Sequence, residues 1–330
     1  MQPTPPHFDE RRERASARRS RRTAPGASPG LAAPAEPEVA GTAAHELGPG
    51  DAVPVRRLLS LAIAGFAGLL GVGLVFGAQT AGVGPARTPY GVVVFGVQAL
   101  FVISWVVATR PPAPRVVAGV GLGTAALADF AAIQPARASI ALLGYAAVAG
   151  FIGGVIGQLS RRSSRVRSTE SLGATIVVVI GVVSFASLIV LTRHPAGTQA
   201  IVAGLTSAAL GLVVARLVDV VAPYPRLAPQ VPRGATGIVL GAMLGSAAGA
   251  FIGAYQDGQD PKKGALVGFV AALAAVLADL SVGYAEAGRE LAGEPGSFWL
   301  ARHLQGPLAG FALAAPALYV ISMLFLIPSL

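Results

Sequence analysis

The sequence has 330 residues, of which 53% are hydrophobic and only 12% are charged, and its mean hydropathy is +0.65. Soluble domains are about one quarter charged, so this composition excludes an ordinary soluble domain and predicts a membrane protein. The absence of cysteine excludes disulfides, thiolate metal sites and thiol nucleophiles. The net charge of +9 does not predict nucleic-acid binding, because the arginines lie in the first 55 residues and in inter-helix loops.

Residues 1–55 are predicted to form a disordered cytoplasmic tail. They are rich in proline, alanine, arginine and glutamate, and residues 9–22 hold seven arginines against three acids. Such a segment cannot bury enough apolar surface to offset the entropy lost on ordering. The alternative to a simply solvated tail is contact with anionic lipids or a protein partner, since clustered arginines are attracted to negative surfaces.

Residues 56–330 are predicted to form one polytopic transmembrane domain. Nine apolar stretches have roughly the length of about 20 residues that a helix needs to cross a bilayer. They run approximately over 58–79, 91–108, 115–133, 138–158, 172–192, 199–222, 235–255, 264–285 and 306–327. The predicted fold class is therefore an all-α bundle of about nine transmembrane helices in the lipid bilayer of the cell membrane.

The basic residues of the short loops predict the orientation of this bundle. The loops on the side of the tail carry ten arginines, at 110, 115, 161, 162, 165, 167, 226, 233, 289 and 302. The loops of the other side carry five basic residues, at 87, 137, 193, 262 and 263. Because basic residues accumulate in cytoplasmic loops, we expect the N-terminus inside the cell and the C-terminus outside.

Two connections carry local predictions. Asp260 followed by Pro261 is typical of a helix N-cap and first helical residue, so the eighth helix should begin there. The stretch SFWLARHL, residues 297–304, is interpreted as a short interfacial segment with Trp299 toward lipid and Arg302 toward water.

The seventh stretch, GIVLGAMLGSAAGAFIG, carries glycine at every fourth position. In lipid, helices associate through close van der Waals contact, which small residues allow. Four residues advance a helix by about 400°, so the glycines drift by about 160° over the stretch and need either a right-handed crossing partner or two neighbours. We predict helix packing, in a compact bundle centred on this helix, for Gly237, Gly241, Gly245, Gly249 and Gly253.

Shorter versions of this glycine-zipper spacing are expected to pack in the same way. They occur at Gly73/Gly77, Gly119/Gly123, Gly150/Gly154, Gly153/Gly157, Gly264/Gly268 and Gly306/Gly310. The functional alternative is that the glycine surface of the seventh helix builds a pore or a homo-oligomer, which the spacing alone does not separate from packing.

Three aspartates fall within predicted helices, where an ionisable side chain is costly and marks a candidate ion or proton site. Asp219 follows Arg216 by three residues, so the two are expected to form an ion pair on one helix face. For Asp129 the alternative to a site is water access near the headgroups. Asp279 has no cation on its own helix, which leaves a proton or cation site, or a buried carboxyl hydrogen-bonded to Ser or Tyr. Four glutamines at or within helix ends are expected to make interhelical hydrogen bonds: Gln79, Gln98, Gln134 and Gln158.

No sequence motif predicts catalysis, a metal site or a cofactor. The histidines, at 7, 45, 194 and 303, lack metal-ligand spacing, and neither a P-loop nor a dinucleotide fingerprint occurs in context. The stretch DGQD, residues 257–260, is interpreted as a polar turn that caps a helix. An enzyme is therefore the least favoured class.

Two functional hypotheses remain. The first is a small-solute or ion permease coupled through an intramembrane aspartate; the similar start offsets of helices one to three and four to six would suit the repeats of transporters, although loop lengths explain them as well. The second is a non-catalytic scaffold for envelope proteins, which would use the basic tail and inner loops.

Overall fold

The computed structural model describes residues 56–80, 87–134, 139–160, 165–256, 260–293 and 298–326, with side chains from residue 169 in the fourth of these ranges. The predicted disordered tail therefore lies outside the described residues. Within them the chain forms nine α-helices: α2 (Arg57–Thr80), α3 (Thr88–Thr109), α4 (Pro114–Ile133), α5 (Ala141–Leu159), α6 (Arg165–Thr192), α7 (Gly197–Val221), α8 (Ala235–Tyr255), α9 (Pro261–Leu291) and α10 (Trp299–Phe325).

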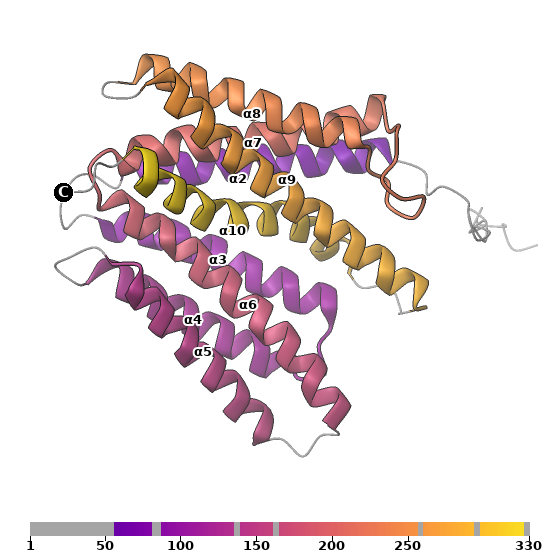
Figure 1. The fold of residues 1–330 in the computed structure, drawn as a ribbon. Helices are drawn as coiled ribbons and strands as arrows, with labels where there is room; N and C mark the ends of the chain where they lie inside the picture. Colours follow the sequence, from indigo (N-terminus) through magenta and orange to yellow (C-terminus); the bar gives the residue numbers. More distant parts are fainter. Residues whose placement is uncertain are drawn as a thin grey trace, which may run out of the picture. The chain divides into compact units, whose positions relative to one another are not determined.

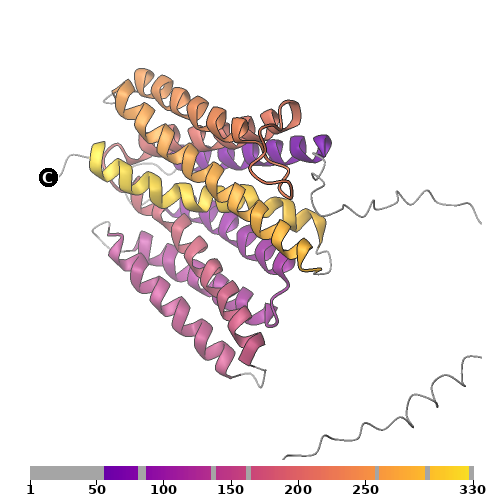
Figure 2. The same cartoon turned by 45° about the vertical axis from the view of Figure 1, so that its right-hand side comes forward.

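The described helices pack in two groups with α10 between them (Figures 1 and 2). One group contains α2, α7, α8 and α9, and the other contains α3, α4, α5 and α6. Helix α10 packs on α9 and α7 on one side and on α3 and α6 on the other. Helices that follow one another run in opposite directions, so one end of this bundle holds the start of α2 and the ends of α7 and α9. We call it the arginine-rich end, for Arg56, Arg110, Arg115, Arg226 and Arg302.

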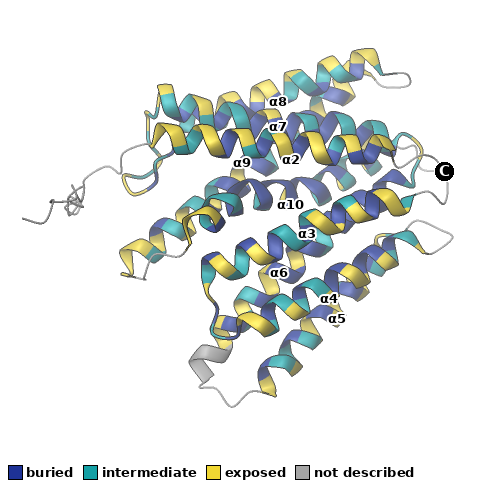
Figure 3. Ribbon diagram, turned by 180° about the vertical axis from the view of Figure 1, so that it is seen from behind, coloured by how far each residue is buried: buried dark blue, intermediate teal, exposed yellow. Residues whose placement is uncertain are grey.

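All nine described helices are long and apolar enough to cross a membrane, which confirms the predicted all-α polytopic class. Large apolar side chains stay exposed along their outer faces, among them Leu69, Phe76, Ile180 and Phe251 (Figure 3). Exposed apolar surface of this extent suits hydrocarbon rather than water. The protein is therefore a multi-pass membrane protein.

The glycine-rich helix α8 lies at the edge of the bundle, with α7 and α9 as its main neighbours. The expectation that the bundle is centred on this helix is therefore wrong. Helices α6 and α7 are the most buried of the nine described. Helix α8 keeps large apolar side chains such as Met243 and Phe251 exposed, and it is its glycine face that is buried against α7 and α9.

The five glycines of α8 form its buried face, and two neighbours share that face. A methyl group at Gly237 or Gly241 would lie 2.8 Å and 2.6 Å from backbone carbonyl oxygens of α7. At Gly245 it would meet both neighbours, α7 and α9, and at Gly249 it would overlap the backbone of α9 at Gly264. Along α8 the glycine face thus contacts first α7 and then α9. Because α7 and α9 cover this face, it is not free to build a pore or an oligomer contact.

The glycines of the shorter pairs divide into two kinds, and the pairs Gly73/Gly77 and Gly153/Gly157 have one member of each kind. Gly77, Gly157, Gly306 and Gly310 have close neighbours. Gly264 and Gly268 face the α8 glycines, and Gly150 and Gly154 face Thr124 and Thr175. A methyl group added at any of four other glycines would have no described atom of a neighbouring helix within 4 Å: Gly73, Gly119, Gly123 and Gly153. For these four the packing expectation is wrong, because a four-residue spacing also occurs on faces that point to lipid.

Two helix boundaries differ from their predictions in a way that matters for the site. Helix α9 continues six residues beyond residue 285, and α10 begins at Trp299 as one continuous helix rather than after a separate interfacial segment. Both extensions contain charged residues, which the hydropathy of the sequence places outside the membrane-crossing stretches. The predicted cap of α9 is confirmed, since Asp260 Oδ1 accepts a hydrogen bond of 2.9 Å from the backbone N–H of Lys262. The rest of the DGQD turn lies outside the described residues.

Candidate functional site: a buried Asp–Arg network beneath a pocket

The α7–α8 connection, residues 222–234, folds back into the bundle at the arginine-rich end. Arg226 and Gly234 form an isolated antiparallel bridge, and the backbone N–H of Leu227 donates to the carbonyl of Arg233. The N–H of Ala235 donates to the carbonyl of Pro225 over 2.9 Å. These backbone bonds hold the last residues of the connection inward, so that the Arg233 side chain is only 3% exposed.

Asp219 lies in the last turn of α7 and supports the start of α8. Its Oδ1 accepts the backbone N–H of Gly234, the N-cap residue of α8, at 2.9 Å, and its Oδ2 accepts from Arg233 Nη1 at 3.3 Å. A carboxylate at a helix N-terminus satisfies a free N–H and suits the positive end of the helix dipole. Asp219 therefore fixes both the beginning of α8 and the position of Arg233.

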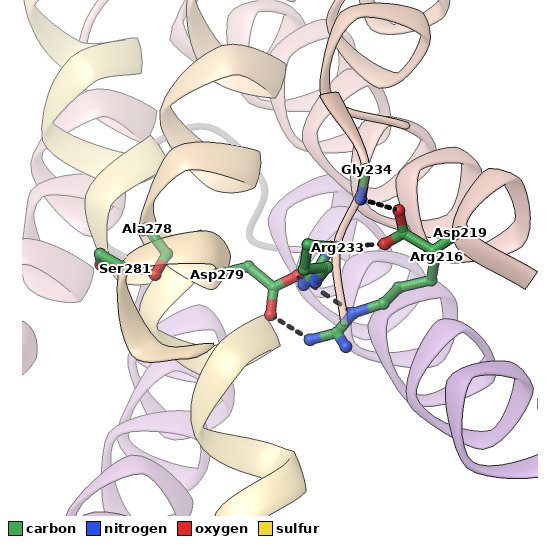
Figure 4. Close-up of polar contacts among 7 residues, drawn as sticks. All are labelled: Arg216, Asp219, Arg233, Gly234, Ala278, Asp279 and Ser281. Atoms are coloured by element: carbon green, nitrogen blue, oxygen red, sulfur yellow. Dashed lines mark hydrogen bonds and ion pairs between the residues drawn. The ribbon is translucent and has the colours of Figure 1, made fainter. Parts of the chain in front are cut away.

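Asp279 of α9 accepts hydrogen bonds from two arginines of different elements (Figure 4). Arg216 of α7 donates from Nη2 to Oδ1 at 2.5 Å and from Nε to Oδ2 at 3.1 Å, which is a bidentate pair. Arg233 Nη2 donates to Oδ2 as well, while its Nη1 reaches Asp219. The result is one connected network of two aspartates and two arginines, in which the Asp279 side chain is fully buried.

The structure corrects the sequence interpretation of these residues. Arg216 forms its ion pair with Asp279, and Asp219 forms its own with Arg233, so the expected pair of Arg216 and Asp219 is replaced by an exchange of partners. The structure gives Asp279 two arginines as partners, whereas the alternative of a buried carboxyl named Ser or Tyr. Nearby Ser281 instead donates to the carbonyl of Ala278 in its own helix (Figure 4).

Arg233 and Gly306 are members of the site that sequence reasoning missed. The sequence interpretation counts Arg233 among the loop charges that set orientation. Asp279 has no basic residue within two turns of it on α9, so a buried charge there calls for a cation from another element, and Arg233 beside the start of α8 is a candidate. Gly306 of α10 lies against the network: a methyl group there would overlap Asp279 Oδ1 and lie 3.1 Å from Arg216 Nη2. The glycine lets the ion pair sit directly on the α10 backbone.

A pocket of about 280 Å³ reaches this network from the arginine-rich end. Its walls come from α2, α7, α9, α10 and the α7–α8 connection, and Arg216, Arg233, Asp279 and Gly306 lie in its lining. Leu59, Ile63, Val231 and Val282 supply apolar wall. The pocket thus combines a narrow apolar wall with buried charge, as is typical of small-ligand sites.

The mouth of the pocket carries a second group of charges. Arg302 of α10 contacts Glu286 at 2.5 Å and also pairs with Glu290, both on the extension of α9. Glu286 and Glu290 follow Asp279 by seven and eleven residues, so all three acids lie on one face of α9. The rings of Trp299 and His303 lie tilted against each other in the same lining, with ring centroids 5.5 Å apart.

Asp129, the third candidate, lies in the other helix group and has a different environment. It is 6% exposed, and its Oδ1 accepts from Gln98 Nε2 of α3 at 2.9 Å; the same amide group donates to the carbonyl of Val182 in α6 at 2.8 Å. The alternative of water access near the headgroups does not fit this burial. Asp129 Oδ2 and Gln98 Oε1 have no hydrogen-bond partner among the described residues.

The glutamine prediction is confirmed for Gln98 and for Gln158, which donates to Ser171 Oγ of α6 at 2.7 Å. In the part of the chain that the structure describes, no group of three His, Cys, Asp or Glu side chains could hold a metal ion. The chemistry that the site offers is recognition of charge in a partly apolar pocket that reaches a buried ion-pair network. A comparison with protein-family models, curated proteins and solved structures finds no match to this chain, so function has to be inferred from this geometry.

Proposed function

We propose that the protein is a permease for a small solute, which enters the pocket at the arginine-rich end, and that the Asp279 ion pairs close the path beyond it. The observation that carries this proposal is the position of the network: two aspartates and two arginines lie buried among membrane-crossing helices at the floor of a pocket.

The cost of burying these charges supports a functional role. Taking an ion pair out of water costs several kcal/mol per ion, and well-packed apolar residues often serve stability as well or better. Charged groups within membrane helices line solute or ion paths in many transport proteins. A merely structural contact between α7 and α9 would be supplied by apolar packing, which these helices already have along their length.

Asp279 acts in this proposal as part of a gate. Its carboxylate holds Arg216 and Arg233 together, and beneath it Gly310 of α10 packs tightly on Ala275 and Leu212. A solute or a proton that competes for either arginine or for the carboxylate would weaken the contact between α7, α9 and α10. In this proposal, transport is coupled to Asp279 because the ion pairs of the network have to open, and not because a proton or cation binds to an unpaired carboxylate.

Cysteine accessibility tests the proposal, because the chain is naturally free of cysteine. Ser60→Cys places a thiol in the pocket wall, and Ala271→Cys places one on α9 two turns beyond Asp279, at a fully buried position. In inside-out and right-side-out vesicles, a membrane-impermeant maleimide should label Ser60→Cys from the arginine-rich side and Ala271→Cys from the opposite side. Ala125→Cys, an equally buried alanine of α4, is the matched control and should stay unlabelled.

Flux completes the test. Purified protein in liposomes should exchange at least one solute of a mixed panel of amino acids, organic acids and inorganic ions measured by mass spectrometry. If Ala271→Cys is silent from both sides and no solute moves, the pocket is a dead end and the permease proposal falls. The scaffold hypothesis, with the tail and inner loops as binding surfaces, would then be favoured.

A further inference from the structure

The charges around the pocket are balanced at two levels. At the floor, two arginines face two aspartates, and at the mouth two arginines accompany two glutamates: Arg216, Arg233, Asp219 and Asp279 below, and Arg56, Arg302, Glu286 and Glu290 above. Asp219 belongs to the lower set through Arg233, while the other seven line the pocket itself. The described lining has four arginines against three acids, and Asp219 behind Arg233 brings the sum of these eight charges to zero.

This balance restricts the ligand. An anion or a cation with a single charge would leave one uncompensated charge in a site enclosed by helices, and such a charge is costly away from water. A ligand that carries one positive and one negative group keeps the sum at zero and can contact both sets. The pocket is thus complementary to a zwitterion rather than to an ion.

Residues of the pocket lining have donor and acceptor atoms that their ion pairs do not use. Arg216 uses Nε and Nη2 for Asp279, and its side chain is 16% exposed, which leaves Nη1 to donate to an anionic group of a ligand. Glu286 uses Oε1 for Arg302, which leaves Oε2 for an ammonium group. Pro307 has no N–H to offer the carbonyl of His303, four residues earlier in α10, so this pocket residue has a further acceptor.

The size and the walls of the pocket restrict the rest of the ligand. A volume of about 280 Å³ lies just below the usual range for ligand pockets, about 300–1,000 Å³, so the ligand has to be small. The side chains of Leu59, Ile63, Val231 and Val282 would contact an apolar substituent, and Trp299 lies in the lining as well.

We propose that the pocket binds a small zwitterion with an apolar substituent, with its anionic group on Arg216 and its ammonium group on Glu286. The substrate class is then that of apolar α-amino acids, and the claim that such a ligand is carried across the membrane rests on the proposed function. A phosphatidylethanolamine headgroup presents the same pair of charges, so the test contains an arm for each source.

The test uses Trp299 as reporter. The chain has two tryptophans, so Trp105→Phe leaves the pocket tryptophan as the single emitter in detergent-solubilised full-length protein. Three compounds on one carbon skeleton are titrated: leucine, 3-methylbutylamine, which lacks the carboxylate, and 4-methylpentanoate, which lacks the ammonium. Leucine should shift the emission saturably and bind at least about 10-fold more tightly than either analogue, equal to about 1.4 kcal/mol. Dihexanoyl phosphatidylethanolamine is titrated in parallel.

A reversal of ligand preference on removal of one charge distinguishes loss of recognition from damage to the fold. Glu286→Gln should weaken leucine and strengthen 4-methylpentanoate, because the pocket then has one positive charge in excess. Glu170→Gln is the control: Glu170 is an exposed acid near the start of α6, at the same end of the bundle and outside the pocket lining, so the preference should stay with leucine. Simple unfolding would lower binding of all ligands alike and would not reverse their order.

Each outcome decides the inference. Saturable binding of leucine assigns a free zwitterion, and binding of the phosphatidylethanolamine alone assigns the headgroup and leaves the zwitterion chemistry standing. Equal binding of the three leucine-like compounds, preference for either analogue, or no binding overturns the inference. Zwitterion binding without flux would overturn the permease proposal only, and flux of another solute without zwitterion binding would overturn this inference only.

Discussion

At the residue scale, Asp279 and Asp129 show how tertiary surroundings separate two buried carboxyl groups. Asp279 accepts three hydrogen bonds from two guanidinium groups and is part of a charge-balanced network. Asp129 accepts one hydrogen bond from a neutral amide, and one oxygen of each partner has no hydrogen-bond partner among the described residues. An aspartate side chain therefore pairs with two cations in one place and accepts a hydrogen bond from a neutral amide in the other.

Neutral replacement of the two aspartates should consequently change stability by very different amounts. Asp279→Asn leaves two arginines with one aspartate, and breaking a buried pair in this way costs about 3–5 kcal/mol. Asp129→Asn keeps the acceptor for Gln98 Nε2 and replaces the unpartnered oxygen with an amide donor, so we expect a change below about 1 kcal/mol. Thermal unfolding in detergent measures both, and similar losses for the two variants would contradict the assignment of the network.

Removing one charge of each sign should restore much of the loss. In the double variant Arg216→Gln/Asp279→Asn, Arg233 still pairs with Asp219, and no charge of the network lacks a partner. The double variant should therefore be more stable than Asp279→Asn alone, with a coupling of about 0.5–3 kcal/mol in the double-mutant cycle. Additive losses would show that the two residues do not act as a pair. The double variant is also the better probe of flux, because Asp279→Asn alone confounds transport with folding.

At the scale of elements, α8 packs through close backbone contact with α7 and α9, and α9 packs against α8, α7 and α10. The α8 glycines admit the α7 and α9 backbones, and the α9 extension brings Glu286 and Glu290 to the pocket mouth. The periodicity of the glycines predicts such contact, but it does not tell a face that meets a neighbour from one that meets lipid. Gly119 and Gly123 have the same spacing and face open space.

This contrast makes a testable pair. At Gly245 a side chain would meet Ala272 of α9 and the carbonyl oxygen of Ser207 in α7 at 2.9 Å, so Gly245→Leu should separate the helices and lower the unfolding temperature or the yield. Overpacking of this kind costs about 1–3 kcal/mol or more. Gly119→Leu adds the same side chain on an exposed face of α4 and should be close to neutral. Equal effects of the two substitutions would remove the packing role of the α8 face.

At the scale of the whole molecule, the odd number of described membrane-crossing helices places the start of α2 and the end of α10 at opposite ends of the bundle. The arginine bias of the loops predicts which end faces the cytoplasm. If the tail is inside, the pocket opens to the cytoplasm, and the proposed permease has its ligand site exposed to the inner solution in this conformation.

Side-specific labelling checks this orientation. Gln230→Cys lies exposed in the α7–α8 connection, and Lys263→Cys lies exposed at the other end, in the first turn of α9. In intact cells an impermeant maleimide should label Lys263→Cys and should leave Gln230→Cys unlabelled until the membrane is opened. The reverse pattern would invert the predicted topology and place the pocket outside.

Much of the architecture follows from composition and periodicity. The nine apolar stretches predict the nine helices that the structure describes, with the exception of polar extensions such as residues 286–291. Asp219 and Asp279 are recognisable as candidates because a charge inside an apolar stretch is visible in the chain itself. Their partners are not recognisable in this way. Arg233 lies in a loop, and the acid closest to Arg216 in the sequence, Asp219, is not the one with which it pairs.

The sequence by itself determined the class of this protein, its helices and which charges lie within them, because these depend on the local match between side chains and lipid. The tertiary structure alone decided which arginine meets which aspartate, which glycine faces meet a neighbour, and that a pocket lies above the network. Those features depend on helices far apart in the chain, and in a membrane they are selected by backbone fit and charge compensation rather than by hydrophobicity, which hardly differs between lipid and protein interior.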